Sequence, residues 1–346
     1  MNKQRKYIFL ITLFSATILA ISSLATSAVD SVGFAITTNT KHNIHSPIYS
    51  QILSSSGFIY DNINNSSNGK KVKVLASFYP IYDFVKHVGG DRIDESVLIP
   101  VGIEPHDFDP TIQQILNAQS ADMLVYNGAG MENAWVNKIN SKFALDTSQG
   151  LHLLTSNNGN NDAHAKIIDP HIWLDPVLAI YQVEKIRDGL IKIDFKNAYY
   201  YNQNAEKFIA QLNSLNASIK SQLSSSNCAK KDFIALHQAF GYFAKRYGLN
   251  QHSIHQGLSP EGEILPQRLQ QVVELAENLG LNVIYTEDLI DPRLASTIAE
   301  EIPNGRVLVL SPIEGLKQQE QKAGLGYLDK MYENLSALKV GLNCKK

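Results

Sequence analysis

Residues 195–226 read FKNAYYYNQNAEKFIAQLNSLNASIKSQLSSS, a stretch that contains neither glycine nor proline. Its apolar residues recur mostly every three or four positions, at Ala205, Phe208, Ile209, Leu212, Leu215, Ile219 and Leu223. This spacing predicts one long amphipathic helix. About 30 helical residues span roughly 45 Å, so the helix would be a stiff connection between the segments on its two sides. Two shorter helices with a break near Asn213-Ser214 are the alternative.

Strands and helices alternate on both sides of this stretch. Before it, we predict strands at 72–77, 96–99, 122–126 and 151–154, with helices at 81–88 and 111–119. After it, we predict strands at 233–236, 251–254, 282–285 and 306–310, with helices at 238–247, 266–279, 292–302 and 324–338. Such alternation implies parallel pairing. The predicted fold class is therefore α/β: two doubly wound lobes with parallel sheets, residues 71–194 and 228–346, joined by a linker helix at 195–227.

The N-terminus has the pattern of an export segment. Lys3, Arg5 and Lys6 precede an apolar run from Tyr7 to Leu24, and small residues follow it. We predict a signal peptide or an uncleaved N-terminal anchor at 1–28. Residues 29–70 are predicted to be a disordered stalk, because they include a polar, turn-forming segment. The rest of the chain is expected to work outside the cytoplasm, and membrane association through the N-terminal segment is an open alternative.

Composition and cysteine content limit the function further. The chain has 346 residues and a formal net charge of −2, without a basic patch, which argues against a nucleic-acid partner. Its two cysteines, Cys228 and Cys344, are expected to form a disulfide in an oxidising compartment, with two free buried thiols as the alternative. Asn-x-Ser sequons at Asn216 and Asn334, and two more in the stalk, are weak candidates for glycosylation.

Three histidines stand in distinctive settings: His106 in Pro-His-Asp, His171 in Asp-Pro-His-Ile-Trp and His237 in Leu-His-Gln-Ala-Phe. They lie 65 (171 − 106) and 66 (237 − 171) residues apart, so only the fold could bring them together. Because ligands bind beyond the carboxyl ends of strands in open α/β sheets, we expect all three in one cleft between the lobes. Three neutral imidazoles and one carboxylate form a tetrahedral zinc site.

A carboxylate is expected as the fourth ligand. Glu314 follows the last predicted strand and is our choice, while Glu287 is its main rival. Asp107 and Asp109 are expected to bind the outer N–H groups of the imidazoles. His164, in a loop rich in glycine and asparagine, is a candidate accessory ligand.

Several segments carry a resemblance to a known family. They are Val72–Pro80, Glu104–Pro110, Asp169–Pro176, Ala235–Phe243, Gly257–Glu263 and Tyr285–Glu287. On these motifs the chain resembles the zinc- and manganese-specific solute-binding proteins of ABC importers, the class with a rigid helix between its lobes. The resemblance extends over nearly everything from Val72 to Leu342.

The resemblance implies that His106, His171 and His237 are metal ligands and that a carboxylate after the last strand can be the fourth. Manganese-preferring members commonly have glutamate where this chain has His237, so zinc is expected and Mn²⁺ is the alternative. The family's usual fourth ligand is an aspartate directly after the last strand, where this chain has Ser311. Glu314 lies three residues further on, and water is an alternative to it.

The sequence thus predicts a monomeric binding protein that captures Zn²⁺ outside the membrane and delivers it to an ABC permease and its ATPase, without catalysis. A secreted zinc hydrolase is one rival, although the chain lacks both HExxH and HxHxD. A surface adhesion protein stabilised by a metal is the other.

Overall fold

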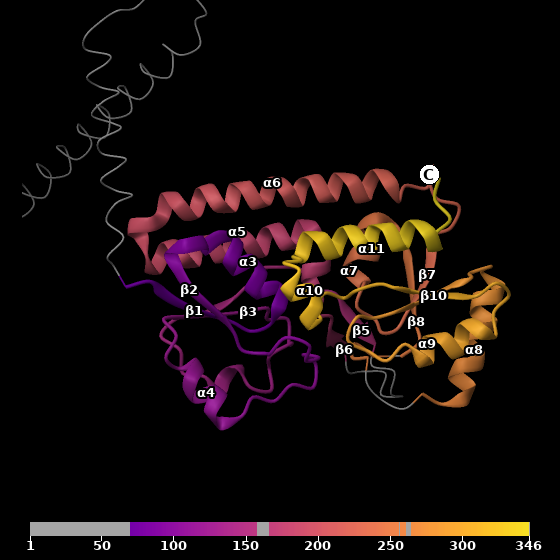
Figure 1. Cartoon of the computed structure of the whole chain (residues 1–346), viewed down its shortest axis with the longest axis horizontal. Coiled ribbons are helices and arrows are strands. Elements are labelled where there is room, and N and C mark those ends of the chain that lie inside the picture. The colour runs from indigo at the N-terminus through magenta and orange to yellow at the C-terminus, as the bar shows by residue number, and fades with distance from the viewer. Residues whose placement is uncertain (1–69, 158–165, 256, 261–263, 346) are drawn as a thin grey trace, which may run out of the picture. The chain divides into compact units, whose positions relative to one another are not determined.

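The computed structural model describes residues 70–345 apart from 158–165, 256 and 261–263 (Figure 1). The predicted export segment at 1–28, the stalk up to residue 69 and His164 lie outside the described residues. From Lys70 onward the chain forms one compact unit. Within the described residues, every helix is too short or too polar to cross a membrane.

The N-terminal lobe is built on a parallel sheet with the strand order β2-β1-β3-β4. Its strands are β1 (Val72–Ala76), β2 (Ile93–Val97), β3 (Met123–Tyr126) and β4 (Ala144–Asp146). Its helices are α3 (Tyr79–Gly89), α4 (Ile112–Ala118) and α5 (Pro176–Ile193). Two short strands, β5 (Thr155–Asn157) and β6 (Lys166–Ile168), pair antiparallel on either side of the undescribed loop.

One strand prediction in this lobe is wrong. The fourth strand of the sheet is β4, not residues 151–154. The apolar run there looks like a strand, but the backbone of Leu154 bonds elsewhere: its N–H donates to the Tyr242 hydroxyl at 2.9 Å, and its carbonyl accepts from Asp169 N–H at 2.9 Å. These bonds tie Leu154 to Tyr242 of α7 and to the segment just before His171.

The C-terminal lobe repeats this construction with the strand order β10-β9-β7-β8, again all parallel. Its strands are β7 (Asp232–Ala235), β8 (Asn250–Ser253), β9 (Val283–Thr286) and β10 (Arg306–Val309). Its helices are α7 (Gly241–Tyr247), α8 (Pro266–Asn278), α9 (Arg293–Glu300), α10 (Gln318–Lys322) and α11 (Tyr327–Gly341). Two parallel sheets with flanking helices confirm the predicted α/β class.

The long helix α6 (Ala198–Gln222) runs without a break through Asn213-Ser214, so the two-helix alternative is wrong. Its 25 residues span roughly 38 Å. Its buried residues follow a spacing of three or four, at Tyr201, Ala205, Phe208, Leu212, Leu215 and Ile219. This face packs on α3 and α5 of the N-terminal lobe and on α11 of the C-terminal lobe (Figure 1). We propose that the N-terminal lobe extends over residues 71–194, the linker over residues 195–227 and the C-terminal lobe over residues 228–346.

Short 3₁₀ turns complete the description: η1 (Gly90–Arg92), η2 (Val136–Lys138), η3 (Ile172–Leu174) and η4 (Phe195–Asn197). The expected disulfide between Cys228 and Cys344 is present. It joins the segment after α6 to the segment after α11, beside a backbone bond from Lys345 N–H to the Asn227 carbonyl at 2.8 Å. The end of the linker helix is therefore fixed to the end of the chain.

Candidate metal centre

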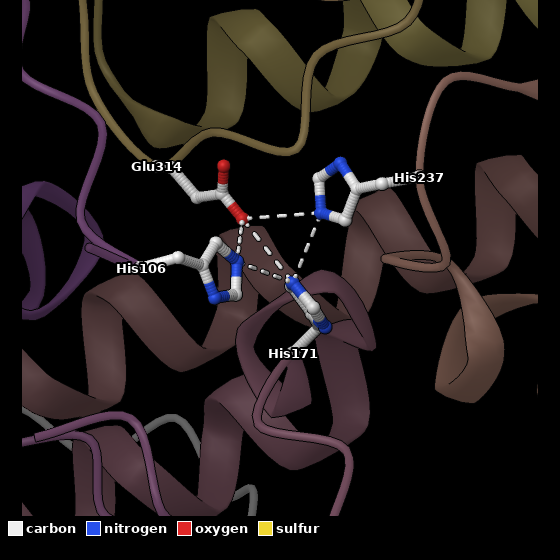
Figure 2. Close-up of side chains that lie close together, drawn as sticks. All are labelled: His106, His171, His237 and Glu314. Atoms are coloured by element: carbon white, nitrogen blue, oxygen red, sulfur yellow. Dashed lines mark hydrogen bonds and ion pairs between the residues drawn. The ribbon is translucent and has the colours of Figure 1, made fainter. Parts of the chain in front are cut away.

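The three histidines and Glu314 converge from four separate segments (Figure 2). His106 lies in the loop between β2 and α4, and His171 directly precedes the turn η3 that leads into α5. His237 follows β7, and Glu314 lies between β10 and α10. Three of these segments follow the carboxyl ends of parallel strands, which is where an α/β sheet presents ligands.

The spacing of the four side chains fits a tetrahedral metal. His171 Nε2 lies 3.2 Å from Nε2 of both His106 and His237. Glu314 Oε1 lies 3.1 Å from His106 Nε2, 3.2 Å from His171 Nε2 and 3.5 Å from His237 Nε2. The ligand nitrogens of the remaining pair, His106 and His237, lie within 4.8 Å of each other. Zinc–ligand bonds of about 2.0–2.1 Å require ligand atoms about 3.3–3.4 Å apart at the edges of a tetrahedron.

Burial isolates this cluster from water. The side chains of His171 and His237 are fully buried, and that of Glu314 is 3% exposed. The His106 side chain is 10% exposed and therefore has the most solvent contact of the four. A cavity of about 800 Å³, lined by α3, α6 and parts of the segment 314–329, reaches Glu314.

Two carboxylates fix the orientation of the buried rings. Asp169 Oδ1 lies 2.8 Å from His171 Nδ1 and accepts from the His171 backbone N–H at 3.0 Å. Glu287 Oε1 lies 2.6 Å from His237 Nδ1. A ring whose Nδ1–H donates to a carboxylate presents the lone pair of Nε2, which is the atom that faces the centre in both cases.

The charges in the site shift the pKa values of its members. Burial alone would lower the pKa of His171, but Asp169 and Glu314 raise it above its ordinary value. Burial also opposes charge on His237, yet Glu287 and Glu314 raise its pKa well above that value. For His106, burial outweighs the attraction of Glu314 and lowers the pKa. Burial of Glu314 is overcome by the histidines, which hold its pKa well below its usual range.

Several predictions about the outer partners need correction. Asp109 pairs with Lys138 at 3.2 Å on the surface, and Asp107 is exposed, so neither holds an imidazole. Asp169 and Glu287 hold the rings instead, which makes Glu287 a partner of His237 and not the fourth ligand. The backbone N–H of His106 donates to Glu104 Oε2 at 3.0 Å. We did not predict roles for Asp169 and Glu104, although both stand two residues before a histidine, where such a bond forms locally.

Ser311, where the family resemblance implies an aspartate ligand, lies outside the cluster of four. Ser311 is buried, and its backbone N–H and its carbonyl each form a hydrogen bond of 2.7 Å with the side-chain amide of Asn334. The same contacts exclude Asn334 as a candidate for glycosylation in the folded protein, because the residue is 2% exposed and both its amide oxygen and its amide nitrogen are hydrogen-bonded. Glu314 is the carboxylate that the structure brings to the histidines.

Comparison with known proteins agrees with this geometry. Residues 74–341 match the family model described as "ZnuA: Zinc-uptake complex component A periplasmic". The chain is 38% identical over 294 residues to the high-affinity zinc uptake system protein ZnuA of Bacillus subtilis, covering 81% of this chain and 90% of that protein. It is 35% identical over 292 residues to the zinc-binding protein AdcA of Streptococcus pyogenes, covering 78% of this chain but 56% of AdcA.

Among solved structures, the Zn(II)-bound ZnuA-like domain of Streptococcus pneumoniae AdcA is similar to this chain with a TM-score of 0.69 and 34% identity. The match covers 79% of this chain and all of that domain. A family model that extends over most of the described residues and relatives of this identity support one assignment. The chain belongs to the ZnuA family of periplasmic zinc-uptake components.

Proposed function

We propose that this protein is an extracytoplasmic solute-binding protein that captures Zn²⁺ and delivers it to an ABC permease and its ATPase. The observation that carries the proposal is the set of four ligand atoms, from His106, His171, His237 and Glu314, with five of their six separations at 3.1–3.5 Å, near the edge lengths of a zinc tetrahedron. The names of the relatives, which describe zinc uptake and zinc binding, support the same cargo. An extracytoplasmic location agrees with a family described as periplasmic.

Zinc is favoured over manganese by the donor set. Three imidazole nitrogens and one carboxylate oxygen suit Zn²⁺, whereas Mn²⁺ prefers more oxygen ligands. His237 decides this balance, because it supplies nitrogen at a buried position. One oxygen of Glu314 faces all three rings, so the site offers four donors at tetrahedral spacing and not the larger number that Mn²⁺ favours (Figure 2).

A binding role is preferred to hydrolysis. A catalytic zinc site keeps one position open for water. Here Glu314 stands at the fourth position, and the three nitrogen donors are nearly or fully buried. The relatives named above are zinc-uptake and zinc-binding proteins. We further propose that the chain works as a monomer and that residues 1–28 associate with the membrane where they are retained.

Calorimetric titration of Zn²⁺ into chelator-stripped protein near neutral pH tests the proposal. We expect one ion per chain, and we expect His171→Ala to weaken binding by more than about 100-fold, since loss of an outer partner alone typically costs 10–100-fold. His252→Ala is the matched control, because His252 pairs with Asp232 at 2.9 Å outside the cluster. Absence of zinc binding in the unmodified protein, or equal affinity of the His171 variant, would refute the proposed site.

Transport is tested separately from binding. The gene should restore growth at low zinc to a strain that lacks its own zinc-binding component but retains a compatible permease. The His171→Ala variant should not restore growth. Restoration by that variant would mean that zinc capture at this site is not how the protein supports growth.

A further inference from the structure

We propose that Asn334 of α11 is a positioning residue that holds the turn 311–314 so that Glu314 faces the histidines. The inference rests on the proposed zinc-binding function and adds to it a residue that touches neither the ion nor any ligand directly. It starts from the backbone on which Glu314 is mounted.

The residue before Glu314 has an unfavourable backbone conformation. Ile313 has φ +58°, in the left-handed region that β-branched residues rarely adopt. Its side chain is fully buried, and its N–H donates to Ser311 Oγ at 3.1 Å. Such a conformation persists only where the surrounding structure enforces it, and it is common where a functional group must be aimed. The question is therefore what enforces it here.

Asn334 binds the turn at its first residue. Its Oδ1 accepts from Ser311 N–H at 2.7 Å, and its Nδ2 donates to the Ser311 carbonyl at 2.7 Å. With two short bonds to one residue, the buried amide fixes both the position and the rotation of the Ser311 backbone. The next carbonyl, of Pro312, accepts from Trp173 Nε1 at 2.7 Å. Two consecutive residues are thus held before the strained one.

The same face of α11 also contacts the other loop that brings a carboxylate to the site. Lys330, four residues before Asn334 and therefore on the same side of the helix, donates to Asp288 Oδ1 at 3.0 Å. Asp288 directly follows Glu287, the partner of His237. The helix therefore fixes the loop of Glu314 and the loop of Glu287 relative to one another.

Loss of the Asn334 bonds should let Ile313 return to an ordinary conformation and carry Glu314 away from the centre. The three histidines would then hold the ion with water in the fourth position. We expect the affinity for zinc to fall by about 10–100-fold, the range typical for losing a partner that orients a ligand.

The test uses the full chain with Asn334→Leu, which removes both bonds at similar volume, and Ser311→Ala, which removes only the hydroxyl that accepts from Ile313. Ser336→Ala is the control, since Ser336 is exposed on the same helix. Zinc affinity is measured by competition with a chelator, and thermal melting verifies the fold. Co²⁺ is used as a spectroscopic probe, because its visible absorption changes when one of its ligands is replaced by water or when the number of ligands changes.

A double-mutant cycle decides whether Asn334 acts through Glu314. In a Glu314→Ala background, Asn334→Leu should change zinc affinity by less than about twofold, whereas in the wild-type background it should cost about 10–100-fold. Equal losses in both backgrounds, or a folded Asn334→Leu protein with wild-type affinity and an unchanged Co²⁺ spectrum, would overturn the inference and leave the proposed function intact. Failure of the wild-type chain to bind zinc would overturn both.

Discussion

Zinc binding to this site should release protons near neutral pH. Burial opposes charge on both buried histidines, but nearby carboxylates overcome it. Asp169 and Glu314 raise the pKa of His171. Glu287 and Glu314 raise the pKa of His237. A histidine with a raised pKa carries a proton in the free protein at a pH where an ordinary histidine is neutral. That proton must leave before Nε2 can bind the ion. Binding is therefore strongest at high pH and weakens as the pH falls, beginning above histidine's ordinary value of about 6.5.

The size of the effect follows from the number of protons released. Each proton changes the free energy of binding by about 1.4 kcal/mol per pH unit. Release of one to two protons, from His171 and His237, corresponds to a loss of about 10- to 100-fold in affinity per pH unit. His106 has a lowered pKa and contributes only at lower pH. Glu314 has a pKa well below its usual range, so it stays charged over the same interval.

The assay is calorimetry from about pH 5.5 to 7.5 in buffers with different heats of ionisation, which gives the number of protons released per zinc. Glu287→Gln should reduce that number, because the amide oxygen still accepts from His237 Nδ1–H but no longer stabilises the imidazolium. Asp232→Asn, at the partner of His252 outside the site, should leave it unchanged. An affinity independent of pH, or release of less than about half a proton near pH 7, would refute this reasoning.

Two further predictions concern stability. Lys330→Met should lower the free energy of unfolding by about 3 kcal/mol, because it leaves the buried Asp288 carboxylate without its cation. The control is Glu333→Gln, which changes a 54% exposed partner of the same lysine and should lower the free energy of unfolding by less than about 1 kcal/mol. Equal melting temperatures for Lys330→Met and wild type would contradict this. Replacing Cys228 and Cys344 together by serine should cost about 2–4 kcal/mol, because the bridge closes a loop of 116 residues. Denaturant titration measures the cost, and a wild-type midpoint would show that the crosslink adds no stability.

The sequence pattern predicted the C-terminal strands better than the N-terminal edge, for a physical reason. Strands β7 to β10 lie within one residue of their predictions, and β7, β9 and β10 are largely apolar runs bounded by polar or turn-forming residues, whereas β8 is polar. At 151–154 a similar run is a loop, since hydrogen bonds to Tyr242 and Asp169 replace those of a sheet. Helix α5, although 18 residues long, is missing from the prediction. Its start is capped by Asp175, whose side chain accepts from Val177 N–H at 2.9 Å.

The site shows a similar division. His106, His237 and Glu314 follow predicted strands, whose ends converge in parallel sheets, and the family resemblance implies all three histidines as ligands. These four residues form the cluster that the structure contains. The partners of the rings depend on which side chain reaches Nδ1 in three dimensions. Glu287 reaches His237 across 50 residues, which no spacing rule predicts. The left-handed conformation of Ile313 was equally hidden, because an isoleucine gives no sign of a turn of this kind.

The position of α6 limits how this site can open. Buried residues of α6 share one apolar core with residues of both lobes, including Phe84 of α3, Leu190 of α5 and Leu338 of α11. A wide swing of the lobes would expose this core to water, at about 25 cal/mol per Å² of apolar surface. The turn that carries Glu314 belongs to the same constraint, because Ile313 lies in this core and Asn334 binds Ser311. The loop that carries His106 is less constrained, since the His106 side chain is the most exposed of the four, at 10%. We therefore expect the ion to enter and leave by displacement of the His106 loop, while α6 holds the lobes and Asn334 holds the turn of Glu314.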